Sequence, residues 1–259
     1  MSRDDIAAEL LWLLHRGKPA GVASPALTAY QDANLVDGER LQLAVLDHWL
    51  RAGEQVGGWK IGWTSRGARA SRPDDFRPFG YVLASRVLPS GTKIEPASIP
   101  QCRLEPEICV RLGTDLAGAD VTVGRARAAV VAVAPAFEVC ARRLPPGMPP
   151  AIRLGNAMNN WGIVVGPEQA PGEVELGALT VRLSRDGEVI DSGTSAPDTL
   201  DDPYLSLSRV CRSLAAHGLG LRAGQHLITG SITNSTPVDP GHLFEATFGP
   251  LGTVAAYAI

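Results

Sequence analysis

The sequence predicts an α+β protein in which a small helical lobe precedes a larger, β-rich domain. Two observations lead to this expectation. Near the N-terminus, apolar residues recur at helical spacing, whereas from about residue 56 onward short apolar runs alternate with turns that contain glycine and proline. We therefore expect two regions, a helical N-terminal lobe formed by residues 1–55 and a β-rich domain formed by residues 56–259.

Two helices are expected in the lobe, over residues 3–16 and about 36–52. Their repeating apolar positions are Ile6, Leu10, Leu13, Leu14, Leu41, Val45, Leu46 and Trp49. Gly53 follows the second helix as a cap, because glycine adopts left-handed backbone angles without penalty. The stretch between the helices is punctuated by glycine and proline and is expected to be a connection.

The β-rich domain is expected to consist of short strands and two more helices. The strands correspond to the apolar runs in VGGWKIGW, FGYVLASRVL, RLEPEICV, APAFEVC, WGIVVG, LTVRLS, HLITGSIT, LFEATF and TVAAYAI. Asp186-Gly187 lies between two alternating runs and predicts a β-hairpin. The helices are expected over residues 123–133 and 203–217, and Gly218 ends the second one.

The overall charge and the cysteines exclude several classes of function. The net charge of −3 leaves no excess of cations to neutralise phosphates, which argues against a nucleic-acid or acidic-membrane partner. The four cysteines occur singly, so we expect free thiols and no disulfide framework. No apolar run approaches the length of a transmembrane helix, and the amphipathic N-terminus is not a signal peptide. We therefore expect a cytoplasmic protein.

Three glutamates occupy positions where a buried strand would have apolar residues. Glu105 and Glu107 lie within RLEPEICV, and Glu138 lies within PAFEVC. Residues two apart on a strand point to the same face, so Glu105 and Glu107 are expected to project together. Two carboxylates that close repel each other unless a cation or a proton lies between them. Three carboxylates in one place would make an oxygen-only site, which suits a hard cation such as Mg²⁺ or Mn²⁺.

The sequence leaves a second interpretation of these glutamates open. Each could face solvent on a half-exposed strand, or form an ion pair with Arg103, Arg142 or Arg143. Pro106 complicates the prediction of a regular strand here, because proline cannot donate a ladder hydrogen bond and favours an edge strand or a bulge.

Lys60 is a candidate for acid–base chemistry. It lies in the glycine-flanked run GWKIGWT, between Trp59 and Ile61. A lysine buried in such a run loses its hydration, and its pKa then falls toward the range that is useful for proton transfer. The alternative is that the side chain extends to the surface from an edge strand.

The end of the strand in LITGSIT is a candidate for substrate binding. Thr229, Gly230 and Ser231 follow one another there. Small residues with free N–H groups can bind a substrate carboxylate. The alternative is an ordinary β-turn.

The ordered set of these motifs resembles a known enzyme superfamily. GWKIGWTS, FGYVL, RLEPEI, PAFEV, NAMNNWGIVVG and ITGSIT followed by GPLGTV are together similar to the fumarylacetoacetate hydrolase superfamily. The group that they resemble most is the 2-keto-4-pentenoate hydratase / 4-oxalocrotonate decarboxylase group. The resemblance covers nearly the whole chain, and it implies a β-rich mixed roll, a homo-oligomer and a role in aromatic compound catabolism.

The resemblance also implies roles for individual residues. It implies that Glu105, Glu107 and Glu138 bind a divalent metal, Mg²⁺ or Mn²⁺, and that Lys60 is the active-site lysine. It implies substrate contacts from a further set of residues, which are Phe79, Gly80, Asn159, Thr229, Gly230 and Ser231.

Three segments depart from the pattern of that group. Pro78 stands where an acidic residue is common before the F-G pair. Residues 157–160 lack the usual aspartate, and residues 201–203 replace a G-H-P segment. The implied metal ligands are kept while parts of the substrate pocket differ, which leaves the substrate open. A non-catalytic protein that associates with a pathway enzyme is therefore one further alternative.

The activity implied is that of a metal-dependent lyase whose partner is a small-molecule 2-oxo acid. The first expectation is a hydratase that adds water to a 2-hydroxypenta-2,4-dienoate-like substrate and gives a 4-hydroxy-2-oxo acid. The alternative is a decarboxylase of a 4-oxalocrotonate-like acid, because both reactions need the same electron sink. An acylpyruvate-type C–C hydrolase ranks lower, because no histidine between His48 and His217 supplies the base that such hydrolases use.

Overall fold

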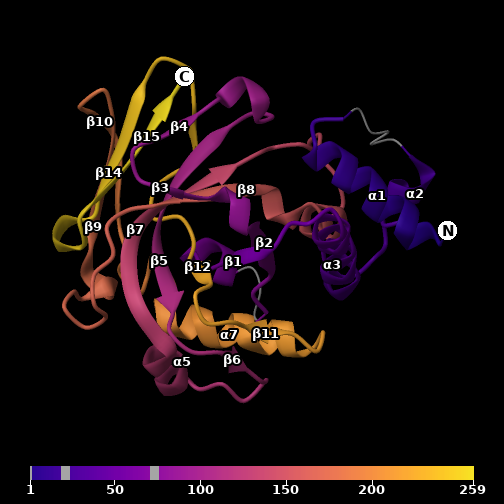
Figure 1. The fold of residues 1–259 in the computed structure, drawn as a ribbon, viewed down its shortest axis with the longest axis horizontal. Coiled ribbons are helices and arrows are strands. Elements are labelled where there is room, and N and C mark those ends of the chain that lie inside the picture. The colour runs from indigo at the N-terminus through magenta and orange to yellow at the C-terminus, as the bar shows by residue number, and fades with distance from the viewer. Residues whose placement is uncertain (1, 19–23, 71–75) are drawn as a thin grey trace.

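The computed structural model describes residues 2–18, 24–70 and 76–259 and confirms an α+β protein (Figure 1). Its helices are α1 (Arg3–His15), α2 (Pro25–Thr28), α3 (Leu35–Arg51), α4 (Arg66–Ala70), α5 (Val123–Ala129), α6 (Pro150–Gly155) and α7 (Pro203–Ala215). Its strands are β1 (Val56–Ile61), β2 (Phe79–Leu83), β3 (Val87–Pro89), β4 (Thr92–Ile94), β5 (Arg103–Leu112), β6 (Leu116–Ala117), β7 (Val130–Cys140), β8 (Asn160–Val165), β9 (Thr180–Arg185), β10 (Glu188–Thr194), β11 (Gly220–Leu221), β12 (His226–Ile228), β13 (Thr236–Pro237), β14 (Leu243–Thr247) and β15 (Thr253–Ala258).

Within the described residues the strands form three sheets. The largest has the order β2-β1-β12-β5-β7-β8-β3, with β13 also paired to β5. A five-stranded sheet has the order β10-β9-β14-β15-β4, and β11 pairs with β6. In Figure 1 the five-stranded sheet lies at one end of the molecule, the N-terminal helices lie at the other, and the large sheet runs between them. No helix in the described part of the chain is both long and apolar enough to span a membrane.

The helices of the lobe begin at side-chain caps and pack onto the β-rich region. Ser2 caps α1 and Asn34 caps α3, each in a reciprocal capping box. Helix α3 approaches α6 so closely that a Cβ atom on Gly38 would lie 2.7 Å from the carbonyl oxygen of Ala151. Glycine is therefore required at this crossing. The lobe supports α6, and α6 lines the cavity described below.

One expectation about the chain path is corrected by the structure. The helix predicted over residues 123–133 ends at Ala129, and Val130 already belongs to β7, because the run VVAV is β-branched and pairs along β5. In the proline-rich stretch that follows β7, Pro150 opens the short helix α6, where a missing N–H costs nothing.

Pro106 lies in the interior strand β5 and not in an edge strand. β7 pairs with β5 along one side, while β12 and β13 pair with the two ends of the other side. Pro106 falls between β12 and β13, and its carbonyl oxygen accepts a hydrogen bond from the Ile232 N–H at 3.0 Å. In an antiparallel strand the nitrogen and the carbonyl of one residue point to the same side. The missing N–H of Pro106 therefore faces this gap, and no bond to β7 is lost.

Candidate metal and substrate site

Two of the predicted metal ligands face each other across the longest strand pair of the large sheet. The antiparallel register of β5 and β7 places Glu105 directly opposite Glu138. Cys140 lies two residues beyond Glu138 and therefore on the same face. One ligand atom from each of Glu105, Glu138 and Cys140 lies within 4.8 Å of the others. Like charges directly opposite each other destabilise a sheet, so this arrangement favours a bound cation.

Glu107 projects to the same face as Glu105 but is held differently. Its side chain is buried, and its Oε2 accepts a hydrogen bond from the Gly230 N–H at 2.6 Å. Burial raises the pKa of Glu107 well above its usual range, and repulsion from Glu138 adds to this effect. Glu107 is not part of the group formed by Glu105, Glu138 and Cys140, whose ligand atoms lie within 4.8 Å of one another. It is the third carboxylate of the cluster and is positioned by the turn after β12.

Lys60 on β1 is buried and pairs with Glu138. Its Nζ donates to both carboxylate oxygens, at 2.7 and 2.6 Å, and Asn160 Nδ2 donates to Oε1 of the same carboxylate at 2.9 Å. Burial alone would lower the pKa of Lys60, but Glu138 together with Cys140, Glu105 and Glu107 outweighs burial and the pKa is raised. The expected fall in this pKa is therefore wrong, and so is the alternative of a surface lysine, because Lys60 is only 7% exposed.

A strained backbone segment positions the groups beside Lys60. Ala157, Met158 and Asn159 have φ angles of 50°, 51° and 67°, in the left-handed region that costs non-glycine residues energy. This path brings the Met158 carbonyl oxygen to 3.5 Å from Lys60 Nζ. It is followed at once by Asn160, whose side chain bonds Glu138. Strain of this kind persists where surrounding structure enforces it, as at binding sites.

Among the substrate-contact residues predicted from the resemblance, some lie beside Lys60, Glu107 or a cavity, whereas the hydroxyls of two others bond backbone carbonyls. Gly80 lies opposite Lys60 in the β1–β2 register, and a Cβ atom there would lie 2.7 Å from Lys60 Cγ. Gly230 contacts Glu107 as described, and Asn159 lines a cavity. The Thr229 hydroxyl donates to the Ile108 carbonyl oxygen, and the Ser231 hydroxyl donates to the Thr233 carbonyl oxygen.

Phe79 differs from the other residues of the predicted set. Its side chain has no exposed surface and packs edge-on against Trp59 and His217. It is therefore part of the hydrophobic core, because β2 places alternate residues on opposite faces and Gly80 is the one that faces Lys60.

The predicted alternative of arginine partners for the glutamates is not realised among the described residues. Arg103 donates to Ser235 Oγ at 2.8 Å, and Arg143 donates to the Asn160 carbonyl oxygen at 3.2 Å. Lys60 is the cation that pairs with Glu138. The glutamates therefore form a cluster with one buried lysine, whereas Arg103 and Arg143 donate hydrogen bonds to other groups.

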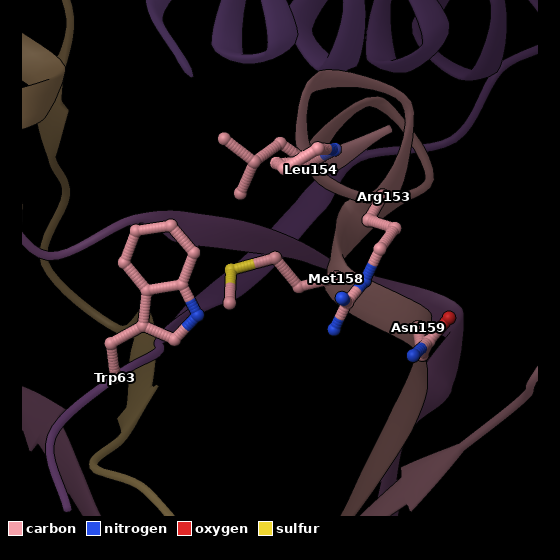
Figure 2. Close-up of a pocket in the computed structure, with 6 residues that line it drawn as sticks. Trp63, Arg153, Leu154, Met158 and Asn159 are labelled. Atoms are coloured by element: carbon pink, nitrogen blue, oxygen red, sulfur yellow. The ribbon is translucent and has the colours of Figure 1, made fainter. Parts of the chain in front are cut away.

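A cavity of about 120 Å³ lies beside the strained segment that follows α6 (Figure 2). It is lined by Trp63, Pro150, Arg153, Leu154, Met158 and Asn159. Figure 2 shows the Met158 side chain reaching toward the indole of Trp63, with the Arg153 guanidinium between Met158 and Asn159. Met158 belongs to the same strained segment whose carbonyl lies beside Lys60. The strained segment therefore contacts both the cavity and Lys60.

Sequence reasoning missed Cys140, Asn160 and the cavity residues Trp63 and Arg153. The alternation that paired Glu105 with Glu107 applies equally to Glu138 and Cys140, and it could have found Cys140. Asn160, Trp63 and Arg153 gave no such signal, because their positions depend on the strained segment and on the packing of α6.

The chain is similar to known proteins over most of its length. The family model for the C-terminal region of fumarylacetoacetate (FAA) hydrolase matches residues 55–257. A 4-oxalocrotonate decarboxylase from Pseudomonas sp is 31% identical over 239 residues, which cover 91% of each chain. A 2-keto-4-pentenoate hydratase from Paraburkholderia xenovorans is 26% identical over 254 residues, covering 97% of this chain and 93% of the relative.

A solved structure is similar over the same extent. It is that of 4-oxalocrotonate decarboxylase from Pseudomonas putida G7 complexed with magnesium and adipate. The TM-score is 0.88 at 23% sequence identity, and the match covers 99% of this chain and 97% of the other. The likeness confirms the predicted fold. The family model, which matches well over half of the sequence, shows that the chain belongs to the fumarylacetoacetate hydrolase family.

Proposed function

We propose that this protein is a divalent-metal-dependent lyase that acts on a small 2-oxo or 2-hydroxydienoic acid. The named relatives are 4-oxalocrotonate decarboxylases and 2-keto-4-pentenoate hydratases, so the hydratase and the decarboxylase expected from the sequence both agree with activities found in the family. The observation that carries the proposal is the pairing of Glu105 with Glu138 across two strands, beside the buried Lys60.

The residues present fit a divalent cation. Glu105 and Glu138 offer carboxylate oxygens at one place, and the repulsion between them is what a cation would relieve. Burial raises the pKa of Glu107, and repulsion from Glu138 and Glu105 adds to this effect. We propose Glu105, Glu107 and Glu138 as the ligands, with Mg²⁺ or Mn²⁺ as the ion. When bound, such an ion would supply a Lewis acid that stabilises negative charge on a substrate oxygen.

Lys60 is proposed to hold or transfer the proton that the reaction needs. Its ammonium is fixed by Glu138 and by the nearby Met158 carbonyl, at the border between the carboxylate cluster and the cavity. From there it can donate to an anionic oxygen or carbon of a substrate. Burial of Lys60 and Glu138 limits the access of water, which strengthens these electrostatic interactions.

The hydratase remains the first candidate, and the decarboxylase is the second. The decarboxylase is favoured by one specific observation, the relative of 31% identity over 91% of the chain. We also propose that the enzyme is homo-oligomeric and cytoplasmic. Its oligomeric state can be measured by size-exclusion chromatography with light scattering.

The test is turnover by chelator-treated protein, with and without added Mg²⁺ or Mn²⁺. The substrates are 2-hydroxypenta-2,4-dienoate and 4-oxalocrotonate, and the products followed are a 4-hydroxy-2-oxo acid and CO₂. We expect activity that depends on the added metal and is lost in Glu138→Gln. Full activity of Glu138→Gln would contradict the proposed site. No turnover of either acid would favour the non-catalytic alternative.

A further inference from the structure

A buried chain of hydrogen bonds connects the N-terminal lobe to the wall of the cavity. His15 Nε2, at the end of α1, lies 2.8 Å from Asn156 Oδ1. Asn156 Nδ2 donates to Asn159 Oδ1 at 3.1 Å, and Asn159 lines both the cavity of Figure 2 and a second hollow of about 270 Å³. His15 is only 6% exposed and Asn156 has no exposed surface, so bulk water does not compete for the bond between them.

The chain has one direction, because an amide donates only through its nitrogen. With Nδ2 directed at Asn159, the Oδ1 of Asn156 faces His15 as an acceptor. His15 therefore carries its proton on Nε2, and its Nδ1 accepts from the Tyr81 hydroxyl at 3.3 Å. The donors thus run from Tyr81 through His15 and Asn156 toward Asn159.

His15 stays neutral, so only one of its ring nitrogens carries a proton. Burial lowers its pKa well below the usual range, and the cations Arg143 and Arg86 add to this effect. Tyr81 also faces the ring, and burial raises the pKa of its hydroxyl, which therefore keeps the proton that it donates. Each link of the chain is thus a bond with one fixed donor.

Asn159 is held so that its amide nitrogen is left for a ligand. Its backbone N–H donates to the Asn156 carbonyl oxygen at 3.1 Å, and its own carbonyl oxygen accepts from the Ala141 N–H at 2.8 Å. Its Oδ1 accepts from Asn156, whereas Nδ2 has no hydrogen-bond partner among the residues that the structure describes. Figure 2 shows this nitrogen on the side of Arg153 and the oxygen on the opposite side. The chain therefore presents the amide N–H donors of Asn159 at the wall of the cavity.

The same bond secures the strained segment beside Lys60. It closes across Ala157 and Met158, whose φ angles of 50° and 51° persist only where surrounding contacts enforce them. The Met158 carbonyl oxygen, within this segment, lies 3.5 Å from Lys60 Nζ. The amide of Asn159 is therefore fixed to the segment that also contacts the proposed proton donor.

We propose that His15 is a positioning residue of the candidate site: through Asn156 it orients the Asn159 amide so that Nδ2 donates to an oxygen atom of the bound acid. This inference rests on the proposed function, in which Lys60 acts on the acid. An oxygen of the 2-oxo acid group and the hydroxyl that hydration adds at C4 are both acceptors that an amide N–H binds. The N-terminal lobe then takes part in recognising the acid as well as in supporting α6.

The experiment measures the binding of 2-oxopentanoate and of 4-hydroxy-2-oxopentanoate to the full-length protein, by calorimetry in the presence of Mg²⁺. We expect His15→Leu to bind one or both acids about three- to tenfold more weakly, as the loss of one hydrogen bond implies. His15→Gln should restore most of the affinity, because glutamine also offers a side-chain N–H to Asn156. A loss for both acids assigns the oxygen to the 2-oxo acid group, and a loss for the hydroxy acid alone assigns it to the C4 hydroxyl.

A double variant shows whether His15 acts through Asn159. Asn159→Ala should lose affinity by a similar factor. The double variant His15→Leu/Asn159→Ala should lose no more than Asn159→Ala alone, because the positioned donor is already gone. Additive losses would mean that His15 acts by another route and would overturn the proposal.

Nitrogen-15 NMR of the histidine-labelled wild type tests the direction of the chain without any substitution. We expect His15 to carry its proton on Nε2. A proton on Nδ1 would reverse every bond of the chain and turn Asn159 Oδ1 toward the cavity. That result would overturn the proposal even where His15→Leu does not fold.

His48→Leu is the matched control, because His48 lies on α3 in the same lobe and stacks on Trp12, with 5.3 Å between the ring centroids. It should bind both acids as the wild type does. Unchanged affinity in His15→Leu, or an equal loss in His48→Leu, would overturn the positioning role and leave the proposed function intact. Failure of the wild type to bind either acid in the presence of Mg²⁺ would overturn the proposed function and the positioning role together.

Discussion

Glu105 and Glu138 lie directly opposite each other on β5 and β7, with ligand atoms within 4.8 Å. Their repulsion costs stability in the metal-free protein, about 0.2–1 kcal/mol for a cross-strand pair of like charges. We expect Glu105→Gln to raise the Tm of the metal-free protein by roughly 0.4–4 °C. The same substitution should remove the increase in Tm that Mg²⁺ or Mn²⁺ produces in the wild type.

Thermal unfolding in chelator and in excess metal checks this prediction. Glu188→Gln is the control, since it neutralises an exposed glutamate on β10 outside the cluster. It should leave the metal-induced increase in Tm unchanged. A Glu105→Gln protein that is still stabilised by metal as strongly as the wild type would show that Glu105 is not a ligand.

Lys60 compensates the buried charge of Glu138, and its removal should be costly. Lys60→Met leaves Glu138 without its cation, and breaking a buried ion pair in this way costs about 3–5 kcal/mol of unfolding free energy. The loss should be smaller in the presence of the divalent ion, because the ion then compensates Glu138. Urea unfolding with and without metal measures both values, and Lys93→Met on β4 is the exposed control. An equal loss in both conditions would argue against a cation at Glu138.

The local parts of the site could be predicted from the sequence. Strand alternation placed Glu105 and Glu107 on one face, and Asp186-Gly187 formed the expected hairpin turn with φ angles of 52° and 86°. These features depend on a few neighbouring residues.

The remaining parts depend on contacts between distant segments. The pairing of Lys60 with Glu138 joins residues 78 positions apart, and the bond from Gly230 to Glu107 joins residues 123 apart. The register of β5 on β7 decides that Cys140 joins the cluster, and no local pattern specifies that register. The direction of the Lys60 pKa shift depends on Glu138 and the other acidic groups of β5 and β7, which the run GWKIGWT does not contain.

Cys140 adds a soft donor to an otherwise oxygen-rich site. Burial raises the pKa of its thiol well above the usual range, and Glu138 adds to this, so the thiol is protonated in the absence of a cation. Thiolate ligands favour softer ions such as Co²⁺ over Mg²⁺. We expect the Co²⁺-loaded protein to show sulfur-to-metal charge-transfer absorption, and Cys140→Ser to lose it. Cys109→Ser is the control, because that buried thiol lies outside the cluster. Identical spectra for Cys140→Ser and wild type would exclude a Cys140–metal bond.

His15 connects the helical lobe to the strained segment and makes stability depend on pH. Its Nε2 donates to Asn156 Oδ1 at 2.8 Å, and Asn156 Nδ2 donates to Asn159 Oδ1 at 3.1 Å. Burial lowers the pKa of His15 well below its usual range, with repulsion from Arg143 as the next contribution. The folded protein therefore keeps His15 neutral, while the unfolded chain binds a proton below about pH 6.5.

It follows that the stabilising effect of neutral His15 is complete above about pH 6.5 and is lost as the pH falls below that value. We expect the unfolding free energy of the wild type to decrease more steeply between about pH 6.5 and 5 than that of His15→Gln, by up to about 1.4 kcal/mol per pH unit. Urea unfolding at a series of pH values measures the difference. Parallel pH profiles for the two proteins would mean that His15 takes up a proton equally well in the folded state, which its burial and the nearby Arg143 oppose.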